Sequence, residues 1–164
     1  MTERLLQYIW QFQLYNKSAL TTFEGEGLQI IHPGTYNTNQ GPDFIDAKIK
    51  IDNTLWAGSI ELHINSSGWA AHKHSDDKNY NNVILHVVWQ HDVAVQLSFP
   101  TLVLQDKVSK LLLTKYDALM HAASFIPCEK MIHQVPELTW ASWKERLLVE
   151  RLQQKSQIVF EYLK

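Results

Sequence analysis

Two acidic residues and one histidine stand at positions where their side chains could act together. Asp43 follows Gly41-Pro42 at the start of an alternating segment, and Glu61 lies two residues before His63. Successive side chains of a β-strand point to opposite faces, so Glu61 and His63 share one face if this segment is a strand. A β-hairpin could bring Asp43 back beside them. The spacing therefore predicts an acid pair with a neighbouring imidazole.

Such a group of side chains suggests metal-assisted hydrolysis. Two carboxylates that converge on one point repel each other unless a divalent cation lies between them. That cation can neutralise the charge of a phosphodiester and activate a water molecule, and a neighbouring histidine can position the water or remove its proton. The alternative for Asp43, Glu61 and His63 is an exposed hairpin face that carries ordinary charges.

A hairpin that could position these residues is visible in the hydrophobic pattern. Apolar and polar residues alternate over 45–51, and a return strand follows over about 55–65. Alternation of this kind is typical of strands that are buried on one face. It places Ile45 on the apolar face of the first strand, and Glu61 and His63 on the polar face of the second.

The remaining pattern predicts a mixed α/β (α+β) chain with the element order α-β-β-β-α-β. The continuous apolar run from Val83 to Trp89 is typical of a central strand that is covered on both faces. A turn-rich segment over 32–43 precedes the hairpin. The expected elements are a helix over 2–19, strands over 28–31, 45–51, 55–65, 83–89, 93–97 and 102–104, and helices over 69–74, 108–122 and 139–164.

Composition excludes several classes of protein. The 164 residues hold 15 Lys and Arg against 17 Asp and Glu, so a formal charge of −2 provides no general basic field for nucleic acid. A single cysteine, Cys128, excludes an internal disulfide, fits a reducing compartment and is expected to be a buried, inert thiol. Polar residues interrupt every apolar run well before a membrane-spanning length. We therefore expect a cytoplasmic protein without a membrane segment.

Apolar residues recur at helical spacing from about residue 139 to the end. A helix of roughly 26 residues would be about 39 Å long, which is more than a compact domain of this size can cover. We expect a core over 1–125, a linker over 126–138, and a long helix over 139–164 that begins a further C-terminal region. This helix could form a homodimer.

Several motifs resemble known families. Pro42-Asp43, followed by the segment from Gly58 to His63, resembles the signature of the PD-(D/E)XK nuclease superfamily, with His63 where that superfamily usually has lysine. More closely, the segments 39–44, 61–63, 80–88 and 146–152 resemble an uncharacterised bacterial family of longer proteins, known as a domain of unknown function. This second resemblance runs over nearly the whole chain.

The superfamily resemblance implies a restriction-endonuclease-like core and a metal-dependent nuclease or phosphodiesterase that acts on nucleic acid. Asp43 and Glu61 would hold Mg²⁺ or Mn²⁺, and His63 would replace the lysine that supports the attacking water. The helix-borne acid of many members has no clear counterpart, since Glu3 lies at the very start of the first helix. Residues that could support this site are His86, His72, His74 and Lys73. The alternatives are a solvated loop for His72 and His74, and a hydrogen-bonded core histidine for His86.

Two other functions fit the same residues. A catalytically silent nuclease-fold module for binding or assembly agrees with the net charge, with the histidine in place of lysine at position 63, and with a middle region that lacks arginine. A hydrolase of a non-nucleic substrate could instead use a metal bound by carboxylate and imidazole.

Overall fold

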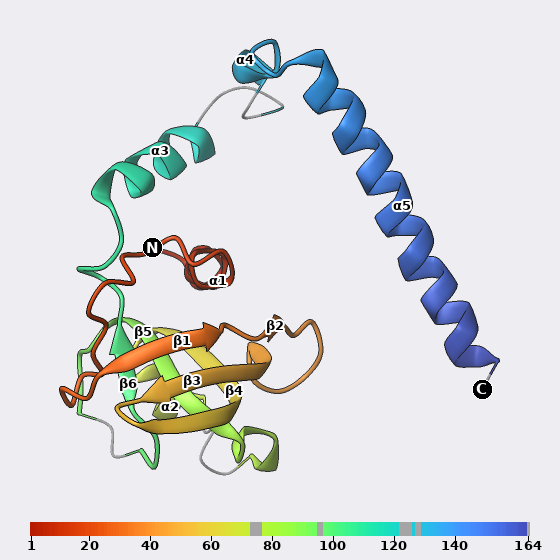
Figure 1. Cartoon of the computed structure of the whole chain (residues 1–164). Helices are drawn as coiled ribbons and strands as arrows, with labels where there is room; N and C mark the ends of the chain where they lie inside the picture. Colours follow the sequence, from red (N-terminus) through yellow and green to blue (C-terminus); the bar gives the residue numbers. More distant parts are fainter. Residues whose placement is uncertain (73–76, 95–96, 122–125, 127–128, 164) are drawn as a thin grey trace. The chain divides into compact units, whose positions relative to one another are not determined.

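The computed structural model describes residues 1–72, 77–94, 97–121, 126 and 129–163 (Figure 1). The residues expected to form the acid and histidine site fall within this part of the chain, apart from Lys73 and His74. Cys128 also lies outside the described residues. The expectations for these three residues are therefore not addressed by the structure.

A six-stranded mixed sheet forms the centre of the fold, which is an α+β architecture as expected. Its strand order is β1-β3-β4-β5-β6, with β2 beside β3. The neighbours β1, β3 and β4 are antiparallel, whereas β4, β5 and β6 are parallel. The strands are β1 (Leu28–His32), β2 (Thr35–Tyr36), β3 (Phe44–Ile51), β4 (Thr54–Asn65), β5 (Val83–Gln90) and β6 (Thr101–Val103).

The hairpin of β3 and β4 determines where the acid pair lies. Phe44 pairs with Ile60 and Ala47 pairs with Gly58, so β3 holds one residue more than β4 between these two pairs. Asp46 has a φ angle of 58°, in the left-handed region, as a β-bulge allows. Because Asp43 directly precedes Phe44, the register places it beside the residue that follows Ile60, which is Glu61.

The bulge also changes which side chains are buried. We expected Ile45 on the apolar face of its strand, but Ile45 is 39% exposed and Phe44 is fully buried. The expected polar face of the return strand is also not solvated, since Glu61 and His63 are only 6% and 2% exposed. This second expectation is wrong because the segment after β4 packs back against the strand.

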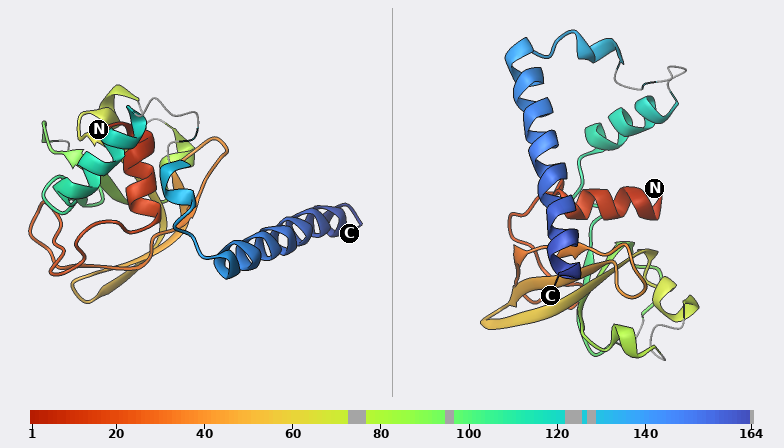
Figure 2. Two further views of the ribbon diagram at one scale, coloured as in Figure 1. Left: turned by 90° about the horizontal axis from the view of Figure 1, so that it is seen from above. Right: turned by 90° about the vertical axis from the view of Figure 1, so that its right-hand side faces the viewer.

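The first helix, α1 (Glu3–Gln11), is shorter than expected. The side chain of Thr2 caps its start by accepting a 3.3 Å hydrogen bond from the backbone N–H of Leu5. The helix does not continue to residue 19, because Gln13 adopts a left-handed φ of 51°. The helix packs against the sheet at β4 (Figure 2). Trp10 is fully buried and donates a 2.9 Å hydrogen bond to the carbonyl of Pro33.

The connection between β4 and β5 crosses over, because these two strands are parallel. It contains α2 (Gly68–Ala71), shorter than the helix expected over 69–74, and the 3₁₀-helix η2 (Lys78–Tyr80). As expected, β5 lies between two strands and is buried over 83–88. No described residue of the expected strand over 93–97 is in a strand; residues 95–96 lie outside the described part.

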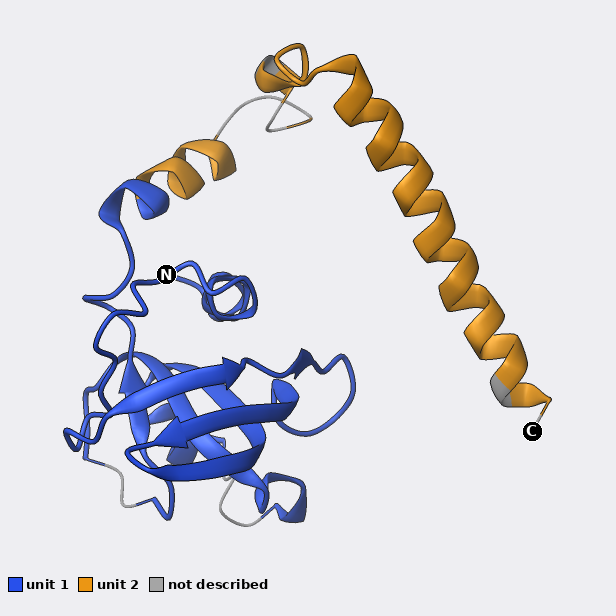
Figure 3. Cartoon of the chain, viewed as in Figure 1, with its two compact units in different colours: residues 1–113 blue, residues 114–164 orange. Residues whose placement is uncertain are grey.

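The chain divides into two compact units, residues 1–113 and 114–164 (Figure 3). Helix α3 (Lys110–Met120) crosses this boundary, and the second unit also contains α4 (Glu129–Ile132) and the long helix α5 (Glu137–Tyr162). Among the described helices, none combines the length and the apolar character needed to cross a membrane. The apolar side chains exposed on and just after α5 include Leu147, Leu148, Leu152, Val159 and Leu163.

Close contact between β4 and β5 depends on Gly58. A Cβ atom at this position would lie 2.4 Å from the carbonyl oxygen of Asn82 and 2.6 Å from Cγ2 of Ile84. We expect Gly58→Ala to lower the free energy of unfolding by about 1–3 kcal/mol, as measured by urea denaturation. The exposed neighbour offers a matched control, Ala57→Ser, which should change it by about 0.5 kcal/mol or less. Equal stability of the two variants would contradict this packing.

Candidate acid and histidine site

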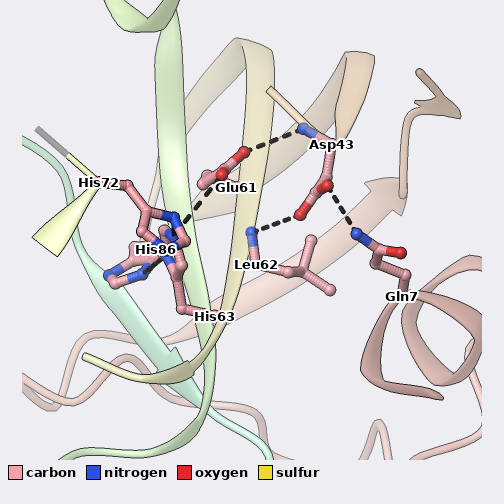
Figure 4. Close-up of polar contacts among 7 residues, drawn as sticks. All are labelled: Gln7, Asp43, Glu61, Leu62, His63, His72 and His86. Atoms are coloured by element: carbon pink, nitrogen blue, oxygen red, sulfur yellow. Dashed lines mark hydrogen bonds and ion pairs between the residues drawn. The ribbon is translucent and has the colours of Figure 1, made fainter. Parts of the chain in front are cut away.

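Asp43 and Glu61 are held together by reciprocal contacts between their strands (Figure 4). The backbone N–H of Asp43 donates to Oε2 of Glu61 at 3.0 Å. In return, the backbone N–H of Leu62 donates to Oδ2 of Asp43 at 3.1 Å. Each carboxyl group is thus fixed by the main chain of the opposite strand.

Helix α1 reaches the same site through Gln7. Its side-chain amide donates a 2.8 Å hydrogen bond to Oδ1 of Asp43 (Figure 4). The hydroxyl of Tyr36, next to β3, donates to the amide oxygen of Gln7 at 3.4 Å. The Asp43 carboxyl therefore accepts one hydrogen bond on each oxygen, from two different elements.

The surroundings of the pair favour protonated carboxyl groups. Burial is the main cause that raises the pKa of Asp43 to about 6; the charge of Glu3 adds to the rise, and the hydrogen bonds from Leu62 and Gln7 oppose it. Burial, followed by the charge of Asp43, raises the pKa of Glu61 to about 8. At neutral pH the two groups together therefore retain a proton that ordinary carboxylates would have lost.

Three histidines from three elements adjoin the pair. Nδ1 of His63 lies 2.9 Å from Nε2 of His86, which comes from β5. Nε2 of His63 lies 3.1 Å from Nδ1 of His72, at the end of α2, and 3.7 Å from Oε1 of Glu61 (Figure 4). Both nitrogens of the His63 ring are thus within hydrogen-bond distance of another imidazole.

The structure brings together Asp43, Glu61 and His63, the three residues predicted to be catalytic. It adds His86 and His72, two of the four supporting residues suggested by the sequence. The other two, Lys73 and His74, lie outside the described residues.

Sequence reasoning missed Gln7 and Tyr80, on two other elements, and it set Glu3 aside. Glu3 lies four residues before Gln7, on the same side of α1, and its charge raises the pKa of both Asp43 and Glu61. The signal in the sequence for Glu3 and Gln7 was their i, i+4 spacing on the polar side of an amphipathic helix. Burial, and then the charges of Glu61 and Asp43, raise the pKa of Tyr80 to about 12, so this phenol also lies close to the acids.

The carboxyl oxygens of Asp43 and Glu61 are the type of donor that hard divalent cations prefer, although two carboxyl groups are a small set of ligands. Within the described residues, no group of three or more His, Cys, Asp or Glu side chains is placed to hold a metal ion. Mg²⁺ is usually bound by one or two carboxylates, while water and substrate phosphate complete its coordination. Each carboxylate oxygen has two lone pairs, so the hydrogen bonds of Asp43 leave it able to accept further bonds. Asp43 and Glu61 are thus ligands of the chemical type that Mg²⁺ takes from a protein.

The fold and the site together define an α+β architecture in which an acid pair, buried at Glu61 and half-buried at Asp43, lies beside a histidine cluster. The chain belongs to a protein family of unknown function, DUF2851, whose model matches residues 3–164. Neither a curated protein nor a solved structure matches the chain.

The raised pKa values predict that stability falls as the pH rises. Because Asp43 and Glu61 titrate at about 6 and 8 instead of their ordinary 3.8 and 4.5, the folded chain retains protons that the unfolded chain has released. The contribution of these two groups to the free energy of unfolding is fully present below about pH 4 and is lost as the pH rises through 6 and 8. Since one pKa unit corresponds to about 1.4 kcal/mol, we expect a loss on the order of a few kcal/mol.

Urea denaturation at pH 5.5 and at pH 8.5 measures this loss. The double variant Asp43→Asn with Glu61→Gln, which cannot titrate at these positions, should show a much smaller difference between the two pH values. A wild-type protein that is equally stable at both, or more stable at the higher pH, would contradict the assignment.

Proposed function

We propose that this chain is a metal-dependent nuclease of the PD-(D/E)XK type, which hydrolyses phosphodiester bonds of nucleic acid. The observation that carries the proposal is the pairing of Asp43 with Glu61 on adjacent strands, with Glu61 largely buried. The element order also supports it. If the short β2 is left aside, the chain forms a helix, three antiparallel strands, a second helix and a parallel strand in this order. A restriction-endonuclease-like core has the same α-β-β-β-α-β order.

Asp43 and Glu61 would hold Mg²⁺ or Mn²⁺. When bound, such a cation neutralises charge on the phosphate and lowers the pKa of a water molecule. Binding also requires both carboxyl groups to be ionised, so it competes with the protons that the raised pKa values favour.

The chain's own contacts orient the carboxyl groups for this task. Leu62 and Gln7 fix the two oxygens of Asp43, and the N–H of Asp43 fixes one oxygen of Glu61. The ring of His63, 3.7 Å from the other oxygen of Glu61, restrains that carboxyl group from the opposite side. Groups held in this way need little rearrangement when the reaction begins.

Cleavage of nucleic acid tests the proposal directly. We expect the full chain to cut single- or double-stranded DNA or RNA in Mg²⁺ or Mn²⁺ at pH 7 to 9. Asp43→Asn and Glu61→Gln should each reduce the rate by about 10² or more, the usual effect of losing a metal ligand or positioned acid. The exposed Asp106 provides a control of the same chemistry, and Asp106→Asn should retain the full rate.

If the folded wild type neither cleaves these substrates nor binds a divalent cation, the proposal is wrong. The module for binding or assembly would then be the better account. One observation favours that alternative: both ring nitrogens of His63 lie against other histidines, so the ring is not directed at a substrate as a catalytic lysine would be.

We also propose that α5 forms a homodimer. Leu148, Leu152 and Val159 recur on one side of this helix and are 56–60% exposed, which is unusual for a row of large apolar side chains. Pairing with a second copy would remove this row from water.

Sedimentation of the full chain over a range of concentrations tests the dimer. The wild type should shift from monomer to dimer as its concentration rises, and Leu148→Asp with Leu152→Asp should remain a monomer. Gln157 lies on the opposite side of α5, so Gln157→Asp is the matched control and should still dimerise. A wild type that is monomeric at every concentration would overturn this proposal.

A further inference from the structure

The three histidines of the site form a continuous hydrogen-bonded row. His86 is fully buried on β5, His63 is 2% exposed on β4, and His72 is exposed at the end of α2. The distances along the row are 2.9 Å from His86 to His63 and 3.1 Å from His63 to His72. The row thus connects the interior of the sheet with the surface of the protein.

Imidazole is well suited to pass a proton along such a row. A neutral ring carries a hydrogen on one nitrogen and a lone pair on the other, so it can donate and accept at the same time. His63 uses both nitrogens in this way, and each of its contacts requires a donor on one ring and an acceptor on the next. The hydrogen atoms of the three rings must therefore be ordered in one direction.

The packing around the row keeps the rings close together. A Cβ atom at Gly68 would lie 2.7 Å from Cδ2 of His63, so only glycine allows α2 to approach this ring so closely. The ring of Trp69, the next residue, stands edge to face with His86 at a centroid distance of 5.5 Å. Asp92 holds the start of the helix by accepting hydrogen bonds of 2.7–3.0 Å from Ser66 and Ser67.

From this arrangement we propose that His72, His63 and His86 are a proton relay, in which the exposed His72 exchanges protons between solvent and the buried acid site. In one passage, His63 gives the hydrogen on Nε2 to Nδ1 of His72, and His72 releases the hydrogen on its other nitrogen to water. A protonated Glu61 then gives the proton on Oε1 to Nε2 of His63, so that His63 ends as it began and Glu61 is ionised. His86 keeps its hydrogen on Nε2 and donates it to Nδ1 of His63, which fixes the tautomer of that ring.

The relay serves the hydrolysis proposed above, and its purpose rests on that function. Attack by water on a phosphodiester releases a proton from the attacking oxygen, and the leaving oxygen must gain one. Glu61 is almost fully buried, yet its Oε1 lies 3.7 Å from the same nitrogen of His63 that contacts His72. A proton on this nitrogen is therefore one short step from the acid pair and one hydrogen bond from the surface.

Exchange of the ring hydrogens with water, measured by NMR on the ¹⁵N-labelled full chain, tests the relay without any substrate. In the wild type, the ring N–H hydrogen of His63 should exchange much faster than the indole N–H of Trp10, which is also buried and bonded to a carbonyl. His72→Phe removes the exposed ring and should slow the exchange at His63 by about 10² or more, the typical contribution of a positioned acid–base group. Added imidazole should restore part of the rate.

His72→Gln separates a relay from a structural contact. Glutamine can keep a hydrogen bond to His63, but it cannot accept a proton on one atom and release another as imidazole does. The relay predicts that the ring hydrogen of His63 exchanges as slowly in His72→Gln as in His72→Phe. Exchange at the wild-type rate in either variant would overturn the relay. If the protein does not cleave nucleic acid, that result counts against the proposed function and not against the relay. The relay is tested by the exchange rates alone.

Discussion

The hydrogen bonds that join Asp43 to β4 are the constraint on which the rest of the site depends. Two N–H groups of the sheet, those of Asp43 and Leu62, are used to bind carboxyl oxygens instead of carbonyls. This arrangement places two acidic groups side by side, although burial and mutual repulsion oppose their ionisation. The site therefore keeps a proton near neutral pH, and the cation that we propose would have to displace it.

Such an arrangement is costly, and the surrounding fold explains how it is maintained. Phe44 and Ile60, paired next to the acids, are fully buried, as are Leu62 on β4 and Leu85 on β5. The apolar area removed from water there stabilises the strands to which the acids belong. Gln7 adds a contact from α1, so the helix, the hairpin and the acid pair are linked directly.

The hairpin and its acid pair were predictable from sequence, because they depend on local alternation and on a short connection. The burial of individual side chains could not be predicted in the same way. The bulge at Asp46 changes which residues of β3 face the core, and no residue type at this position indicates a bulge. The contact between His63 and His86 depends on a parallel pairing across a crossover of many residues, which spacing alone does not specify. Gln7 was missed for the same reason, because the orientation of a helix on a sheet is set by packing.

The most direct measurement of the central claim is a ¹³C NMR titration of the carboxyl carbons of Asp43 and Glu61, with and without Mg²⁺. The account predicts midpoints near pH 6 and pH 8 without the cation, and lower values for both when Mg²⁺ is present, because the cation favours the ionised forms. Midpoints near the ordinary carboxyl values, or midpoints that Mg²⁺ does not move, would contradict it.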